Sequence, residues 1–145
     1  MADMITQRNI GALVALVTSI APESSSGGTI NGNAVDRSLH GLANSCVLHQ
    51  MVGAVSGAPT TLAVQTALQH SPDGVTWIPF QINAAPQQTA ALAAADSENG
   101  VAIDLTTAYR FIRPEMTVTF TGGTTPSALV AADLVLGGER VLAAI

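Results

Sequence analysis

The segment Thr60-Thr-Leu-Ala-Val-Gln-Thr-Ala-Leu-Gln-His70 carries the clearest structural signal in the chain. Its even-numbered positions include Leu62, Val64 and Leu68, whereas odd-numbered positions such as Gln65 are mostly polar. Side chains alternate between the two faces of a β-strand. The pattern therefore predicts a strand with one buried face and one solvated face.

The next four residues, Ser71-Pro-Asp-Gly74, have the composition of a tight turn. Pro72 presets φ for the second position of a type I turn, and Gly74 supplies a left-handed residue after it. We expect Asp73 to accept backbone N–H groups within this turn rather than to bind calcium. Residues 75–82 are then expected to form a strand that pairs back on residues 60–70 as a hairpin.

The rest of the chain is also typical of β-structure, because Thr, Val, Ile and Ala dominate and turn signals recur roughly every ten residues. Residues 83–99 are expected to be a long, partly ordered loop, with a short helix at 89–95 as the alternative on propensity. Further strands are expected at 13–20, 29–35, 44–55, 101–105, 108–113, 117–121 and 129–136. Together these elements predict an all-β fold, a single antiparallel β-sandwich of jelly-roll type with about eight strands.

The length of 145 residues favours one domain. We expect residues 1–35 to form an extended N-terminal arm and the first strands, and residues 139–145 to form a C-terminal tail. The apolar run at 10–21 is not expected to be a signal peptide, because Asp3 accompanies Arg8 before it and Pro22 follows it. We interpret this run as a buried strand or arm. No apolar stretch is long enough for a membrane helix, so we expect no membrane partner.

Charged residues make up only 10% of the chain, compared with about 25% in an ordinary soluble domain. The five basic residues are all Arg, and the net charge is −5. A chain without Lys cannot form a Schiff base or supply the lysine of a P-loop. Five scattered Arg also do not make the basic stripe that nucleic-acid binding needs. So few charges suit a protein that buries much of its surface against neighbours.

A metal site is not expected from the Cys and His residues. Cys46 is the single cysteine, so the chain forms no internal disulfide. His49 lies three residues after Cys46, and side chains at that spacing on a strand point to opposite faces. Neither His40 nor His70 has a partner at the spacing of a zinc site. We expect these histidines to be isolated polar or interface residues.

The sequence also predicts no catalytic centre and no cofactor. The serines at 24–26 lack the Gly-x-Ser-x-Gly spacing of a nucleophile elbow. The glycines at 122–123 head no expected helix, so they do not form a phosphate site. A cross-strand carboxylate pair of Asp104 and Asp133 remains open at this stage.

Two groups of residues near the expected hairpin have structural interpretations. Trp77, the single tryptophan, is expected to fill the core rather than to form a platform for a ligand. Along 108–113 the alternation places Arg110 and Arg113 on opposite faces. At least one of them must lie at a sheet edge or pair with an acid, because burying an unpaired guanidinium is costly. Glu115 and Asp104 are the expected partners.

Three motifs resemble the small head decoration proteins of tailed phages, which are also named capsid cement proteins. They are Gln69-His-Ser-Pro-Asp-Gly-Val-Thr-Trp77, Ala108-Tyr-Arg-Phe-Ile-Arg113 and the turn Gly122-Gly-Thr-Thr-Pro-Ser127. The resemblance covers roughly residues 36–138. It implies a jelly-roll-like subunit, a homodimer or homotrimer, which binds the major capsid protein on the outer surface of the virion. It implies that the protein stabilises the shell and catalyses nothing.

The apolar ends of the chain are the expected contact sites, because they would otherwise stay in water. The residues predicted to contact partners are Arg8, Ile10, Leu13, Arg140, Val141, Leu142 and Ile145.

Two alternative functions remain open from the sequence. A discoidin-like carbohydrate-binding module is also a jelly roll and has a similar Ser-x-Asp-Gly-x-x-Trp hairpin. Aromatic residues make up only 3% of this chain, however, and the paired terminal cysteines common in that family are missing. A tail or fibre component of a virion is the other alternative, which only its location distinguishes from a cement protein.

Overall fold

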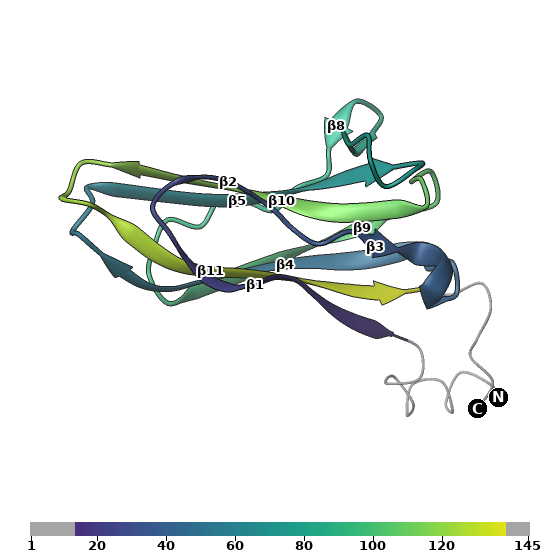
Figure 1. Ribbon diagram of the computed structural model, residues 1–145, viewed down its shortest axis with the longest axis horizontal. Helices are drawn as coiled ribbons and strands as arrows, with labels where there is room; N and C mark the ends of the chain where they lie inside the picture. The colour runs from purple at the N-terminus through teal and green to yellow at the C-terminus, as the bar shows by residue number, and fades with distance from the viewer. Residues whose placement is uncertain (1–13, 139–145) are drawn as a thin grey trace.

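The computed structural model describes residues 14–138, which form two antiparallel β-sheets packed face to face (Figure 1). Sheet A has the strand order β1 (Ala15–Ser25), β11 (Ser127–Gly137), β4 (Ser45–Ser56) and β9 (Ser97–Asp104). Sheet B has the order β2 (Gly28–Asn31), β10 (Phe111–Thr121), β5 (Thr61–Ser71) and β6 (Ile78–Pro79), with β3 (Val35–Asp36) also on β10. A 3₁₀ turn, η1 (Arg37–His40), and a hairpin of β7 (Gln81–Ile82) and β8 (Ala85–Pro86) complete the elements.

The path of the chain is that of a jelly roll. It crosses between the sheets from β1 to β2, from β3 to β4 and from β4 to β5. It crosses again from residues 87–92 of sheet B to β9, from β9 to β10 and from β10 to β11. Residues 87–92 return along β5 through bridges at Gln88 and Leu92, and so complete sheet B. The prediction of an all-β, antiparallel jelly-roll sandwich is confirmed. The expected arm at residues 1–13 and the tail at 139–145 lie outside the described residues.

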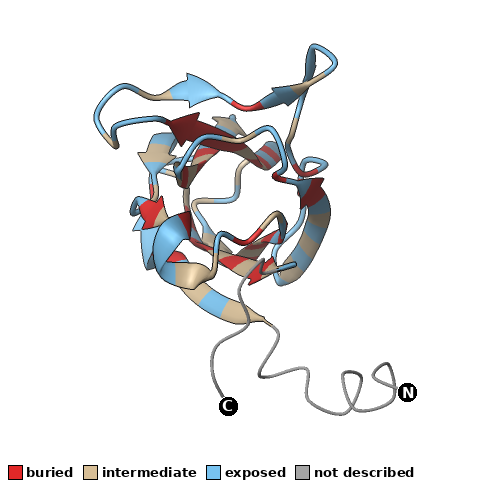
Figure 2. Ribbon diagram, turned by 90° about the vertical axis from the view of Figure 1, so that its right-hand side faces the viewer, coloured by how far each residue is buried: buried red, intermediate tan, exposed pale blue. Residues whose placement is uncertain are grey.

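The core lies between the sheets and is built from alternate residues of the long strands (Figure 2). Leu62, Val64 and Leu68 of β5 are buried as predicted, and they face apolar residues of sheet A. The largest buried side chain is Phe80, which the sequence analysis did not single out. Trp77 is only partly buried, so the expectation that it fills the core is wrong. The main core cluster contains Val35, Ala43, Cys46, Leu48, Leu68, Phe80, Ile103, Leu105, Ile112, Leu134 and Leu136.

The turn after β5 forms as predicted, but the strand expected at 75–82 does not. The Asp73 carboxylate accepts the backbone N–H groups of Val75 at 2.8 Å and Thr76 at 2.9 Å. These amides are therefore held in the turn and cannot form a ladder with β5. Only β6 pairs with β5, over two residues, and the chain then turns away into the β7–β8 hairpin.

Residues 83–99 are more ordered than the loop that we expected, and they contain no helix. Asn83 and Ala84 have positive φ angles of 51° and 63°, which suit the tight turn between β7 and β8. The backbone of Leu92 then exchanges two hydrogen bonds with Val64 of β5. The next strand, β9, begins at Ser97 rather than at residue 101.

β10 is continuous through Pro114, where two strands were predicted to join. The proline carbonyl accepts a hydrogen bond from Gly32, so its nitrogen faces the same side. On that side β2 and β3 are separated by residues 32–34, and no ladder hydrogen bond is needed from the proline. Proline is tolerated in a strand at such an interruption.

The apolar run at 10–21 contributes an edge strand rather than a buried one. Ile20 of β1 is buried, but Leu16 is 71% exposed on the outer side of sheet A. The expectation of a buried strand is therefore only partly correct. Among residues 14–138 there is no helix of the length and apolar character that crossing a bilayer requires.

Cys46 should be chemically inert in the folded chain. It lies in the core, and burial raises the pKa of its thiol to about 12 from an ordinary 9.0. Because the thiolate is the reactive form, alkylation by iodoacetamide at pH 8 is expected to be about a thousandfold slower than in the unfolded chain. Mass spectrometry with and without urea measures both rates. Equal rates would show that Cys46 is accessible.

Candidate functional site

The outer faces of the two sheets differ in chemistry. The outward side chains of sheet B are mostly polar, as expected for a sheet face in water. They include Thr61, Gln65 and Gln69 of β5, and Arg113, Glu115, Thr117 and Thr119 of β10. The outward side chains of sheet A, in contrast, are mostly apolar.

Two apolar rows cross the outer side of sheet A. The strand register places Leu16, Val135, Val47 and Ala102 in one row across all four strands. Leu16 is 71% exposed and Val47 is 41% exposed. The second row lies four residues further along the strands, where Ala131 of β11 is opposite Met51 of β4. Leu129, beyond this row on β11, is 45% exposed. Apolar side chains in contiguous exposed rows mark an interaction surface.

A polar row separates the two apolar rows. It contains Thr18, Asp133 and His49 in register. His49 lies between two carboxylates: its Nε2 is 3.3 Å from Oε2 of Glu98, and its Nδ1 is 3.9 Å from Oδ2 of Asp133. We name the whole outer surface of sheet A the A face. It comprises Leu16, Thr18, Val47, His49, Met51, Asp96, Glu98, Ala102, Asp104, Leu129, Ala131, Asp133 and Val135.

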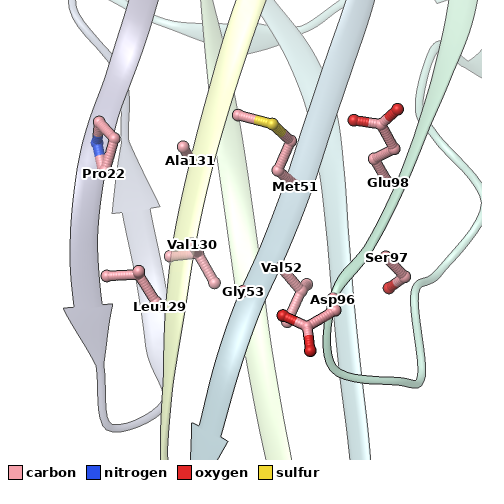
Figure 3. Close-up of a pocket in the computed structure, with 10 residues that line it drawn as sticks. All are labelled: Pro22, Met51, Val52, Gly53, Asp96, Ser97, Glu98, Leu129, Val130 and Ala131. Carbon is pink, nitrogen blue, oxygen red and sulfur yellow. The ribbon is translucent and has the colours of Figure 1, made fainter.

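The A face is hollowed on both sides of its polar row. A hollow of about 450 Å³ is lined by Pro22, Met51, Glu98, Leu129 and Ala131, which come from all four strands (Figure 3). A second hollow, of about 600 Å³, is lined by residues at the other end of the sheet, including Val14, Val47, Ala102, Asp104 and Val135. The surface can therefore receive projecting side chains from a partner.

The charges on the A face are acidic. Asp96 and Glu98 line the first hollow, Asp104 lines the second, and Asp133 lies between them. The described arginines lie elsewhere: Arg37 is buried, Arg110 pairs with Asp36, and Arg113 lies on sheet B. A partner that presents a cation among apolar side chains would complement this face.

Arg37 is a buried cation that the sequence analysis did not identify. Its Nε and Nη2 donate to the carbonyl oxygen of Ala43 at 2.9 and 2.6 Å. Its Nη1 donates to the carbonyl oxygens of Ala108 at 2.9 Å and Tyr109 at 3.0 Å. The side chain thus ties the segment after η1 to the loop before β10. No spacing in the sequence indicates this contact, because it joins residues far apart in the chain.

The expected acid partners of Arg110 and Arg113 are wrong. Arg110 makes a bidentate pair with Asp36, with Nη2 2.7 Å from Oδ2. The hydrogen bond from Arg110 holds the pKa of Asp36 well below its ordinary value. Asp104 instead accepts the backbone N–H of Thr106, and its pKa is lowered by that bond.

Trp77 forms part of a polar chain on the surface of sheet B. The guanidinium of Arg113 lies 4.4 Å from the centre of the indole ring. Arg113 donates to Oε1 of Gln69 at 2.7 Å, and Gln69 donates to Glu115 at 2.9 Å. One face of the tryptophan ring is therefore covered by Arg113, which limits stacking of a sugar to the other face.

The remaining candidates do not form a catalytic or metal site. Cys46 is buried whereas His49 lies on the A face, so their predicted opposite orientation is confirmed. Asp133 lies opposite His49 and Asp104 lies opposite Ser45, on strands at either side of β4. They therefore do not make a facing carboxylate pair. Among residues 14–138, no three His, Cys, Asp or Glu side chains are grouped to hold a metal ion.

The serine and glycine motifs have structural roles. Ser25 is buried at the end of β1, and its Oγ accepts the backbone N–H of Gly27 at 3.2 Å. Gly122 and Gly123 have positive φ angles of 71° and 81° in the turn between β10 and β11. Both motifs therefore form the turns that join strands.

His70 should make the fold sensitive to mild acid. It stacks on Tyr109 with ring centres 4.4 Å apart, and its Nδ1 accepts the backbone N–H of that residue at 3.1 Å. Desolvation lowers the pKa of His70 below its ordinary 6.5. The folded state then binds fewer protons than the unfolded state, so its stability is full above pH 6.5 and falls as the pH drops below that value.

Urea unfolding at pH 7.5 and pH 5.5 tests this expectation. The wild-type chain is expected to be less stable at pH 5.5, and the difference is expected to shrink in His70→Asn. An equal loss in both proteins would show that other groups cause it.

The predicted contact residues Arg8, Ile10, Leu13, Arg140, Val141, Leu142 and Ile145 all lie outside the described residues. Their role therefore stays a prediction. The A face was not predicted. The sequence signal that could have found it is the apolar content of both alternating sets in 44–55 and 129–136, which marks strands without a polar face.

No protein-family model and no curated protein matches this chain. Among solved structures, VP2 of infectious bursal disease virus in a subviral particle is similar at 14% identity and a TM-score of 0.47, over 85% of this chain and 32% of that chain. The Gx strain of the same virus gives 14% identity and a TM-score of 0.48, over 89% and 33%. Desmodium yellow mottle tymovirus gives 10% identity and a TM-score of 0.27, over 92% and 89%.

The chain thus spans about a third of the length of the bursal disease virus chains that it matches. At these identities and TM-scores, the likeness carries no conclusion about what this chain does.

Proposed function

We propose that this chain is a structural virion protein, a decoration or cement protein that binds the outside of a phage head and stabilises the shell by bridging capsid subunits. The observation that carries the proposal is the A face, where apolar rows from four strands remain in water in the isolated subunit. Contact with a neighbour would remove this surface from water. The protein acts by binding and carries out no reaction.

Burial of the A face would supply a useful but moderate binding energy at each copy. Apolar surface contributes about 25 cal/mol for each Å² removed from water, and the loss of rigid-body freedom on association offsets part of this. A bridging protein touches more than one subunit, and linked contacts raise the overall affinity without a strong single contact. Such a protein needs a large, weakly charged surface, and only 10% of this chain is charged.

The partners that follow are the major capsid protein and further copies of this chain, as a homodimer or homotrimer. The terminal residues predicted as contacts, which are Arg8, Ile10, Leu13 and the tail from Arg140 to Ile145, would add contacts of their own. The sequence resemblance to head decoration proteins supports the same partners.

A carbohydrate-binding function has weaker support. Sugar rings stack on exposed aromatic faces, and Arg113 covers one face of the single tryptophan, Trp77. A glycan screen in which Trp77→Ala loses binding without unfolding would favour that function instead.

Immunogold labelling of virus particles from the source of this sequence tests the proposal. Label is expected over the outer surface of the head. Label confined to tails or fibres would assign the chain to those structures, and particles without label would overturn the proposal. Full-length protein added back to undecorated heads should cosediment with them and raise the temperature at which they release DNA.

A further inference from the structure

We infer that the A face binds residues 1–13 of a second copy of this chain, with Arg8 placed at the cluster that His49 forms with Asp133 and Glu98. The inference rests on the proposed function, because it identifies the self-contact within the proposed oligomer. The A face of one copy is then the binding surface for residues 1–13 of the other copy.

The chemistry of the face selects a cation with apolar neighbours. Carboxylates of Asp133 and Glu98 lie on either side of His49, at 3.9 and 3.3 Å, in the middle of the face. The two apolar rows lie on either side of the polar row that contains Asp133 and His49, and each apolar row borders a hollow. A guanidinium pairs well with carboxylates, and aliphatic side chains on each side of it would fill the hollows.

Residues 1–13 have this composition. Their sequence is Met-Ala-Asp-Met-Ile-Thr-Gln-Arg-Asn-Ile-Gly-Ala-Leu, with Arg8 between the uncharged residues Gln7 and Asn9. Ile10 lies two residues after Arg8, which in an extended chain is about 6.6 Å. Rows two residues apart on the sheet have this same spacing, so Ile10 would lie on the Val47 row or the Met51 row. The other terminal arginine, Arg140, follows Glu139, whose charge opposes binding to an acidic face.

The segment is long enough to reach a neighbour. Thirteen extended residues span about 43 Å, whereas the six residue steps from Val47 to Gly53 along the face span about 20 Å. Val14 lines the second hollow, and β1 begins at the next residue at the end of sheet A (Figure 1). A chain that continues in the strand direction passes the end of the sheet, so binding to its own face would need a reversal at this point. Exchange of a segment between copies needs none.

A direct contact between the A faces of two copies is disfavoured by charge. Such a dimer would bring Asp96, Glu98, Asp104 and Asp133 of each copy together, with His49 as the one basic side chain among the described residues of the face. Juxtaposed like charges oppose association. The arm of the second copy supplies the missing cation instead.

Disulfide trapping between full-length variants tests the inference. Ile10→Cys protein is mixed with Val47→Cys or Met51→Cys protein under mild oxidation, and covalent heterodimers are measured on non-reducing gels. We expect a heterodimer with one of these two partners at least tenfold above that with Thr119→Cys, a matched position on the outer side of sheet B. Native Cys46 is buried and gives the background in wild-type protein.

The outcomes separate the alternatives. No heterodimer above the Thr119→Cys control would overturn the inference. An intrachain disulfide without any covalent dimer in the Ile10→Cys/Met51→Cys and Ile10→Cys/Val47→Cys double variants would overturn it as well.

Charge exchange is the second measurement. Arg8→Glu is expected to weaken self-association at least tenfold in sedimentation equilibrium, and adding Glu98→Arg in the same chain is expected to restore it. Thr119→Glu adds a negative charge on the outer side of sheet B instead, and it should leave self-association unchanged. Absence of any effect of Arg8→Glu would contradict the inference, and circular dichroism checks that each variant is folded.

The inference and the proposed function fail in different ways. If trapping fails but the protein still cosediments with heads, only the arm contact is wrong. If the arm is trapped but the protein neither labels nor binds heads, the self-contact holds and the cement function is wrong.

Discussion

Association of this chain with its neighbours is expected to weaken at least a hundredfold when Met51 is replaced with aspartate. Met51 lies on the A face next to the polar row and lines the first hollow, beside Glu98. An aspartate at this position would take the place of an apolar contact and lose its water when a neighbour binds, which costs free energy. It would also add to the acidic charge that already lies on this face. A hundredfold change corresponds to about 2.7 kcal/mol of binding free energy.

Light scattering coupled to size-exclusion chromatography, together with cosedimentation with heads, measures this change. Thr119→Asp is the matched control, because it places the same charge on an exposed position of sheet B. We expect this control to associate as the wild-type chain does. If the two variants associate equally well, the A face is not a contact surface.

Loss of the Arg37 side chain is expected to give the largest change in stability. Arg37→Met keeps much of the apolar stem but leaves the carbonyl oxygens of Ala43, Ala108 and Tyr109 without the guanidinium. An unsatisfied buried polar group costs about 1–3 kcal/mol, so we expect the free energy of unfolding to fall by roughly 3 kcal/mol or more. A small domain has a free energy of unfolding of only about 5–15 kcal/mol, so a loss of this size would clearly lower the urea concentration at the unfolding midpoint.

Urea unfolding followed by circular dichroism measures the loss. Arg110→Met is the matched control: the Arg110 side chain is 56% exposed in its ion pair with Asp36, so its removal is expected to have a smaller effect. Equal losses in the two variants would show that burial of Arg37 is not the cause.

The fold was largely predictable from local pattern. The alternation in residues 60–70 places Leu62, Val64 and Leu68 in the core, and the strands expected at 44–55 and 129–136 form as β4 and β11. Alternation reflects only which side of a strand faces the core, so it survives without knowledge of the neighbouring strands. The turn at Ser71 to Gly74 was predictable for the same reason, since its bonds lie within a few residues.

The errors arose where a distant residue decides the outcome. Trp77 was expected in the core, but the buried aromatic side chain of this segment is Phe80. The indole of Trp77 instead packs against the guanidinium of Arg113 on sheet B. Arg110 was assigned to Glu115 or Asp104, whereas its partner Asp36 is 74 positions away in the chain. No spacing rule reports such contacts.

Local pattern could predict single strands of the candidate site but not their assembly into one face. Composition and alternation already show a weakly charged β-sandwich with apolar outer positions on some strands. Which outward residues become neighbours depends on strand order. The strands β1, β11, β4 and β9 meet only because the jelly-roll path places the last strand, β11, between β1 and β4. The acidic row around His49 and the hollows on each side of it exist only in that register, because each strand alone supplies one or two of the side chains.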